Sequence, residues 1–308
     1  MKEQSPDHFS ILGGGFGIYG YAAAVSELNN FKKVTTLEKY RPLVRKHIAS
    51  NYLDKFEFIN TSGDLVSNSL LLNIALPPYC QAKHLYREMP CQHLFLEKPL
   101  APSPVESLEL CRILIDRNVS FSVGYLFLFT RWFHQLKSQL ENNATSEVTI
   151  RWTFYAHHYR LNLNNWKRFH SAGGGALRFF AIHLVAVLSI LKFNTILGQS
   201  VSIRVTSSDE MPNLFISFAN SQRQTIHLIV DSKRDQTIFQ ITDQDAGVIF
   251  ESQSPFDDPE LEQKSDARIR YLQSYIQDVC SFSLNITPHD HIDIFKLWME
   301  IENYIRIK

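Results

Sequence analysis

The chain has 308 residues, of which 44% are hydrophobic and 20% charged, and its formal net charge at pH 7 is zero. This length predicts about two domains, and the composition is that of an ordinary globular protein. A zero net charge without a basic stripe argues against nucleic acid or an anionic membrane as a partner.

The sequence also predicts where the protein works. Its start, MKEQSPDHFS, is polar and lacks the apolar core of a signal peptide. The longest apolar stretch, 176–191, is interrupted by Arg178, His183 and Ser189, and we interpret it as too short and too polar to span a bilayer. The cysteines form no C-x-x-C pair, as expected of free thiols. We therefore expect a cytoplasmic protein.

In chain order, the first predicted elements are a strand over 9–12, a glycine-rich turn and an alanine-rich helix. Gly15, Gly17 and Gly20 fit G-x-G-x-x-G, whose glycines allow a tight turn, close approach of a pyrophosphate, and close helix–strand packing. A register that starts at Gly13 needs a third glycine where the chain has Ile18, so we prefer the first. The unpaired N–H groups at the start of the helix favour phosphate. A plain glycine turn is the alternative. The predicted cofactor contacts here are Gly15, Phe16, Gly17, Ile18, Tyr19 and Gly20.

A second strand, 33–37, ends at Glu38, close to where a carboxylate that binds the cofactor ribose is expected. A carboxylate there repels the 2′-phosphate of NADP and therefore favours NAD. Lys39 and Arg41 are nearby and would still admit NADP. We include Glu38 and Arg41 among the cofactor contacts.

The rest of the first half alternates helix-like and strand-like segments. Helices are predicted near 41–51, 78–88 and 104–118, and strands near 55–59, 69–76, 92–96 and 119–123. This alternation predicts a parallel, doubly wound sheet, whose ligands bind beyond the C-terminal ends of its strands. Ala75, Leu76 and Pro77 lie at such an end and are predicted to border the cofactor.

The second half is richer in closely spaced strands. After a helix near 131–141, strands are predicted over 147–155, 201–206, 214–218, 225–231, 237–242 and 248–250, with a helix over 176–191 and two final helices over 266–281 and 290–307. Neighbouring strands without helices between them should pair mainly antiparallel. We expect a dinucleotide-binding domain over 1–124 and a substrate and oligomerisation domain over 125–308.

At 94–99, LFLEKP, an apolar strand ends in Glu97, Lys98 and Pro99. A lysine beside a cofactor can be partly desolvated, which lowers its pKa and lets it transfer protons near neutral pH. Taken alone, this motif favours a solvated Lys-Pro turn.

Several short motifs follow one another in order: the glycine turn, Ala75-Leu76-Pro77-Pro78, Glu97-Lys98-Pro99, Val123-Gly124-Tyr125, and Gly173-Gly174-Gly175-Ala176-Leu177 followed by His183. This series resembles the glucose–fructose oxidoreductase / inositol dehydrogenase / MocA (Gfo/Idh/MocA) family over most of residues 9–190. The resemblance implies a Rossmann domain followed by an α+β domain with a mostly antiparallel open sheet. It also implies NAD or NADP and hydride transfer to or from a carbon of a sugar, cyclitol or sugar nucleotide.

The resemblance further implies roles for individual residues. Lys98 would orient the substrate hydroxyl and transfer its proton, and His183 would lie beside the reacting carbon. Glu97 and Lys98 would also border the cofactor. The loop through Tyr155, Trp166 and Lys167 would border the sugar. The predicted substrate contacts are Tyr125, Tyr155, Trp166, Lys167, Arg178 and His183.

The chain departs from the family pattern at several positions. Phe179 stands where the family's helix usually has an aspartate one turn before the histidine, and no carboxylate occurs over 171–191. Ala186, Gln81 and Leu128 replace a second aspartate, a histidine and an arginine. We interpret the site as a variant that relies on Lys98 and His183.

Two further features have alternative interpretations. Arg178 is either a helix-surface residue or a residue at the pocket rim that pairs with a carboxylate or phosphate of the substrate. His157-His158 and His289-Asp290-His291 have no matching second pair at ligand spacing, so no metal site is predicted.

We therefore expect an NAD(P)-dependent oxidoreductase that acts on a small molecule and forms a homodimer or homotetramer. A redox-neutral glycosidase or lyase of the same fold that uses NAD, or a non-catalytic nucleotide-binding protein, is the alternative.

Overall fold

The computed structural model describes residues 7–142, 146–198, 202–204, 209–258 and 266–307. Its contacts divide the chain into two compact units. The first unit comprises Met1–Ala101, Glu109–Leu126 and Lys264–His291, and the second comprises Pro102–Leu108, Phe127–Gln263 and Ile292–Lys308. This division assigns the described residues 266–291 to the first unit, whereas the sequence predicts a second domain over 125–308.

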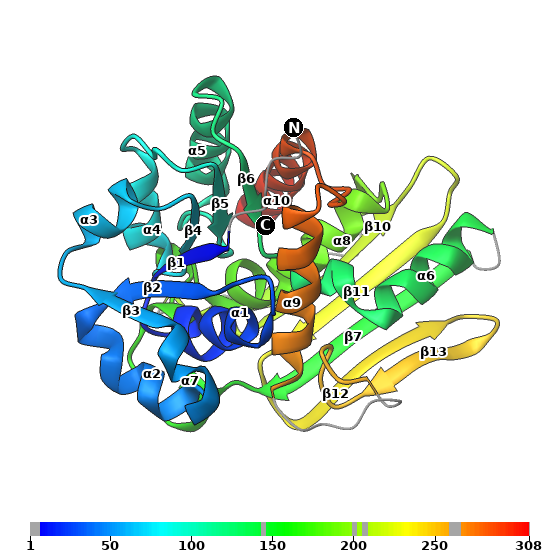
Figure 1. Ribbon diagram of the computed structural model, residues 1–308. Helices are drawn as coiled ribbons and strands as arrows, with labels where there is room; N and C mark the ends of the chain where they lie inside the picture. Colours follow the sequence, from blue (N-terminus) through cyan, green and yellow to red (C-terminus); the bar gives the residue numbers. More distant parts are fainter. Residues whose placement is uncertain (1–6, 143–145, 199–201, 205–208, 259–265, 308) are drawn as a thin grey trace. The chain divides into compact units, whose positions relative to one another are not determined.

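A six-stranded parallel sheet of order β3-β2-β1-β4-β5-β6 forms the centre of the first unit (Figure 1). Its strands are β1 His8–Leu12, β2 Lys33–Leu37, β3 Phe56–Ile59, β4 Leu71–Ile74, β5 His93–Leu96 and β6 Phe121–Val123. This order is that of a Rossmann fold and confirms the predicted doubly wound sheet. β4 is buried at every position, as a central strand covered on both faces must be.

The helices of the first unit follow the strands in alternation. They are the π-helix η1 Gly17–Ala22, α1 Ala23–Glu27, η2 Glu38–Tyr40, α2 Arg41–His47, η3 Ser50–Lys55, α3 Ser62–Ser67, α4 Pro78–Leu85, α5 Pro104–Asp116, which continues from the second unit, and α9 Ala267–Cys280. α9 lies beside α1, where Gln273 Nε2 donates to Glu27 Oε2 at 2.8 Å (Figure 1). On its inner face α9 buries Tyr271, Leu272, Tyr275 and Ile276.

The second unit contains a sheet of order β13-β12-β7-β11-β10-β8, with β9 paired to β10. Its strands are β7 Glu147–Tyr155, β8 Thr195–Ile196, β9 Ser202–Arg204, β10 Asn213–Ala219, β11 Thr225–Asp231, β12 Lys233–Asp243 and β13 Gly247–Ser252. Antiparallel pairs predominate, which confirms the prediction, whereas β7 and β11 pair in parallel. Of the strand predicted over 201–206, residues 201, 205 and 206 lie outside the described residues.

The helices of the second unit are η4 Leu126–Phe129, whose first residue belongs to the first unit, α6 Arg131–Glu141, α7 His157–Arg160, η5 Trp166–Arg168, η6 His170–Ala172, η7 Ala176–Ala181, α8 Ile182–Ile190 and most of α10 Pro288–Ile307. Residues 182–189 of α8 are all buried, so this helix belongs to the core. Among the described residues, one helical stretch, His170–Ile190, is long and apolar enough by composition to cross a membrane, contrary to the expectation of too short a stretch. However, 83% of its most apolar window is buried, as in the core helix of a globular unit.

Candidate functional site

The glycine turn follows β1, and the steric need for glycine can be tested position by position. A Cβ on Gly13 would lie 2.3 Å from the carbonyl oxygen of Ala75, so the tight turn requires glycine there. A Cβ on Gly15 would meet nothing within 4 Å, and Gly15 is exposed. A Cβ on Gly17 would lie 3.1 Å from Ile11 Cγ2, so Gly17 allows η1 to pack close to β1.

These three roles are the ones that the dinucleotide fingerprint assigns to its glycines. The steric need for a tight turn falls on Gly13 and that for close helix–strand packing on Gly17, with Gly15 as the open position between them. Because Gly13, Gly15 and Gly17 do not have the G-x-G-x-x-G spacing, the register of 15, 17 and 20 stays a prediction. A Cβ on Gly20 would instead lie 2.5 Å from the ring of Phe16. The neighbour of Gly13, Ala75, follows another strand, β4, so spacing along the chain could not reveal it.

The turn fits a pyrophosphate. Gly15 leaves open space, so a phosphate could approach the backbone at the start of the helix. The Ile18 and Tyr19 N–H groups donate to the Gly15 carbonyl oxygen at 2.9 and 3.2 Å. Ala75, Leu76 and Pro77 follow β4, the strand beside β1, and are at least partly exposed. Ile18 is buried, so any contact with the cofactor from this position would come from its backbone.

Glu38 and Arg41 form a bidentate ion pair after β2. Arg41 Nε and Nη2 donate to Glu38 Oε1 and Oε2, both at 2.7 Å. The same guanidinium lies 3.9 Å from the ring centroid of Phe58. Hydrogen bonding from Arg41 lowers the pKa of Glu38, so the side chain is a carboxylate at neutral pH.

The Glu97–Leu100 turn, which carries Lys98, is held by Gln81 of α4. Gln81 Nε2 donates to the carbonyl oxygens of Glu97 at 2.7 Å and Leu100 at 3.1 Å, and its Oε1 accepts from the Glu97 N–H at 3.1 Å. Gln81 is fully buried, and the Lys98-Pro99 peptide bond is cis. The amide thus fixes the backbone on both sides of Lys98, a role that the sequence did not reveal.

Glu97 lies beside Tyr21, a residue for which the sequence predicts no role in the site. A Cβ on Gly124 would lie 2.7 Å from the Tyr21 hydroxyl and 3.4 Å from Glu97 Oε1, so this glycine leaves room for both groups. Burial raises the pKa of Glu97 to about 7, although the charge of Lys98 and the nearby Tyr21 hydroxyl limit the rise. A buried carboxyl that titrates near neutral pH therefore lies next to Lys98 in the chain.

His183 belongs to the second unit, whereas Lys98 belongs to the first. The imidazole stacks on Phe127 with ring centroids 4.6 Å apart and an interplanar angle of 24°. Phe256 meets it edge-on at 6.2 Å, and His183 is buried. The environment of His183 within its unit is thus largely aromatic.

Phe179 forms a partly exposed cluster with two predicted substrate residues. Its ring lies 5.2 Å from that of Trp166, and Lys167 Nζ lies 5.1 Å from its centroid. A Cβ on Gly174 would lie 2.3 Å from the Trp166 carbonyl oxygen, so the glycine triplet lets this loop lie against the start of η7. Tyr155, at the end of β7, is exposed.

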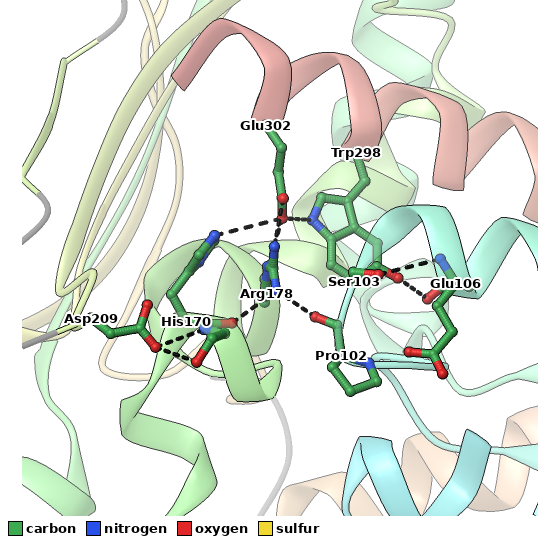
Figure 2. A network of polar contacts seen from close by, with 10 residues as sticks. Pro102, Ser103, Glu106, His170, Arg178, Asp209, Trp298 and Glu302 are labelled. Carbon is green, nitrogen blue, oxygen red and sulfur yellow. Dashed lines mark hydrogen bonds and ion pairs between the residues drawn. The ribbon is translucent and has the colours of Figure 1, made fainter. Parts of the chain in front are cut away.

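Arg178 is not available to a substrate in the predicted way. Its Nε and Nη2 donate to the two carboxylate oxygens of Glu302, both at 2.6 Å. Its Nη1 donates to the carbonyl oxygens of Pro102 and His170. Figure 2 shows Arg178 directed at Glu302 of α10, with Trp298 Nε1 donating to the same carboxylate at 2.9 Å. These contacts give Arg178 a structural role and correct its assignment as a substrate ligand.

Tyr125 is also a core residue. It is fully buried, and its ring lies 6.0 Å from that of His291 within the first unit. A ring without exposed surface offers nothing to a substrate, so the predicted contact from Tyr125 is not supported. Among the described residues, no group of three or more His, Cys, Asp or Glu side chains could hold a metal ion.

The chain is similar to known proteins in its three-dimensional structure. No family model and no curated protein matches the chain. Solved structures do. The WlbA dehydrogenase from Bordetella pertussis, in complex with NADH and UDP-GlcNAcA, matches with a TM-score of 0.72 at 13% identity, covering 97% of this chain and 95% of that one.

Two further structures match over nearly their full lengths. GenD2 from gentamicin A biosynthesis, in complex with NAD, has a TM-score of 0.67 at 13% identity, with coverage of 95% and 92%. The scyllo-inositol dehydrogenase from Lactobacillus casei has a TM-score of 0.68 at 13% identity, with coverage of 98% and 96%. The resemblance to Gfo/Idh/MocA dehydrogenases is thereby confirmed at the level of the fold.

Proposed function

We propose that this protein is an NAD(P)-dependent oxidoreductase that transfers a hydride to or from a CH–OH carbon of a sugar, cyclitol or sugar nucleotide. The observation that carries this proposal is the glycine turn after β1, in a sheet of Rossmann order, with Gly15 open beside the start of a helix. The similar structures support it, since two of them hold NAD or NADH and one also holds UDP-GlcNAcA.

The cofactor would lie along the C-terminal ends of β1, β4 and β5. The backbone around Gly15 would bind the pyrophosphate, and Glu38 would bind the adenosine ribose. Glu38 is a carboxylate at neutral pH, so a 2′-phosphate would meet its negative charge, which favours NAD, whereas the paired Arg41 would still admit NADP. When bound, the nicotinamide accepts or donates the hydride.

The protein's own part in the reaction is proton transfer and orientation. In the oxidative direction, the substrate hydroxyl loses its proton to Lys98 as its carbon loses the hydride, which leaves a carbonyl. Gln81 keeps the backbone beside Lys98 in place through hydrogen bonds to Glu97. His183 would orient the substrate, and the cluster of Phe179, Trp166 and Lys167 would border it, in place of the family's aspartate.

Fluorescence titration with NADH and NADPH tests the cofactor, and a panel of cyclitols, uronates and sugar nucleotides tests the substrate. Lys98→Ala should lower kcat by about 10²- to 10⁴-fold, the usual contribution of a general acid–base group, with the dissociation constant of NADH little changed. A protein that binds neither dinucleotide would refute the proposal, and full activity in Lys98→Ala would refute the role of Lys98.

The lack of a carboxylate over 171–191 favours one alternative, a redox-neutral glycosidase or lyase that uses its NAD transiently. Cofactor that co-purifies and is not consumed in turnover would support it, whereas stoichiometric NADH formation would exclude it. The cytoplasmic location and the homodimer or homotetramer remain predictions.

A further inference from the structure

We propose that Arg268 of α9 is a ligand of the cofactor's pyrophosphate, supplied to the glycine turn from the far end of the chain. The inference rests on the proposed function, because it requires a bound dinucleotide. It concerns a residue that no sequence motif identifies.

The position of Arg268 is defined first by two aromatic rings of the turn. Its guanidinium carbon lies 5.0 Å from the ring centroid of Phe16 and 5.5 Å from that of Tyr19. Phe16 stands between Gly15 and Gly17, and the two rings meet edge-on at 5.4 Å. All these residues belong to the first unit. Arg268 thus lies directly beside the turn that we expect to hold phosphate.

A second observation places Arg268 at the ligand edge of the sheet. Burial raises the pKa of Glu97, and the charge of Arg268 is among those that oppose the rise. Glu97 follows β5, whereas the turn follows β1, and only β4 separates these strands. The charge of Arg268 is therefore felt at Glu97 after β5 as well as beside the turn after β1, and a dinucleotide crosses a Rossmann sheet at these strand ends.

The guanidinium is oriented before any ligand arrives. Asp266, the residue that precedes α9, accepts from Arg268 Nε at 2.9 Å and also from its Nη2. This pair uses the Nε–Nη2 edge, and Tyr19 is a further hydrogen-bonding neighbour of the guanidinium. A phosphate oxygen would meet the donors that remain. The arginine side chain is 35% exposed, which leaves part of it accessible.

Charge complementarity points to the same ligand. Residues 9–28, which include the whole turn, contain no lysine or arginine. A pyrophosphate carries two negative charges, for which the helix start offers only partial charges. Arg268 brings a cation from α9 that is paired on one edge with Asp266, and arginine binds phosphate well because its planar donors match the phosphate oxygens.

The test compares Arg268→Met with Arg270→Met. Methionine retains an aliphatic chain against Phe16 and Tyr19 but has no charge. Arg270 is a matched control on the same helix, with its guanidinium carbon 5.5 Å from the ring of Tyr271. NADH is titrated by fluorescence and ADP-ribose by calorimetry, each at low and high salt, and the melting temperature of each free variant is recorded.

We expect Arg268→Met to weaken both ligands by about 10- to 100-fold, as for one lost charge-assisted hydrogen bond, and to reduce the salt dependence of binding. Arg270→Met should bind within about twofold of the wild type. Should Arg268→Met prove unfolded, Arg268→Lys, which retains the charge, should fold and keep the salt dependence of the wild type.

Three results would overturn the inference. The first is wild-type affinity in Arg268→Met. The second is a loss of affinity that leaves the salt dependence unchanged, because this indicates a change of shape and not a lost charge. The third is an Arg268→Lys protein that folds but lacks the wild-type salt dependence. If the wild type itself binds neither NADH nor NADPH, the proposed function fails as well, so the two failures are distinguishable.

Discussion

At the scale of single residues, Arg178 and Glu302 form an ion pair whose side chains are 5% and 3% exposed. Removing both charges from water costs several kcal/mol per ion, which bidentate hydrogen bonding offsets. Removing one partner leaves the other charge buried without compensation. The loss of stability is therefore larger than the net contribution of the intact ion pair.

We expect Arg178→Met to lower the free energy of unfolding by about 3–5 kcal/mol, measured by urea unfolding. The double variant Arg178→Met/Glu302→Leu should lose less, because no charge remains buried alone. Arg234→Met is the control, since the Arg234–Asp231 pair is exposed on the arginine side and should contribute at most about 1 kcal/mol. If Arg178→Met had unchanged stability and a raised KM, the result would support the predicted role of Arg178 as a substrate ligand.

Glu97 gives a pH-dependent prediction. Its pKa is raised by burial to about 7, from an ordinary value of 4.5. Between these values the folded protein binds more protons than the unfolded chain, so the contribution of this group to stability falls as pH rises and levels off above pH 7.

Glu97→Gln removes this titration. Relative to the wild type, the variant should gain roughly 3 kcal/mol of unfolding free energy between about pH 4 and pH 8. Urea unfolding of both proteins across this range measures the difference. An equal difference at every pH would show that Glu97 titrates as an ordinary exposed acid.

At the scale of elements, α4 lies in the connection from the C-terminal end of β4 to the start of β5. The helix begins at Pro78, a favoured residue for a first turn, and its buried face carries Gln81. Through that amide, the helix fixes the backbone of the Glu97–Leu100 turn. The position of the proposed proton carrier therefore depends on a helix that it does not belong to.

Gln81→Met has nearly the same length but cannot hydrogen-bond to the turn. We expect kcat to fall by about 10- to 100-fold, since a small displacement of a catalytic group can cost about 100-fold. The dissociation constant of NADH should stay within about threefold. Lys83→Met, at an exposed position of the same helix, should have no effect on either. A kcat in Gln81→Met equal to that of the wild type would show that the Glu97–Leu100 turn keeps its conformation without these hydrogen bonds.

At the scale of the whole molecule, the first unit is completed by a late part of the chain. Tyr275 of α9 is fully buried, its hydroxyl lies 2.6 Å from Ser122 Oγ of β6, and its ring meets Phe95 of β5 at 5.7 Å. A dinucleotide-binding domain cut at residue 124 would therefore lack part of its own core.

A fragment of residues 1–124 should consequently be unfolded or aggregated, because it exposes the surface that α9 covers. Circular dichroism and size-exclusion chromatography measure this, with the full chain as reference. A monomeric fragment that melts cooperatively and binds NADH would contradict both this expectation and the need for Arg268.

The sequence alone determined the two sheets, the alternation of helices and strands in the first half, and the order of the motifs. It could do so because hydrophobic periodicity and turn residues act between near neighbours in the chain. It also placed Glu38 directly after the second strand, Lys98 in the turn after the strand that ends at Leu96, and His183 in the apolar helix.

Only the tertiary structure decided what individual residues do. Gly13 takes the tight-turn role because Ala75 follows the neighbouring strand β4, and Arg178 is structural because Glu302 of the last helix pairs with it. Arg268 reaches the glycine turn for the same reason. Each role depends on a partner far away in the chain, and the spacing of residues along one sequence carries no information about such partners.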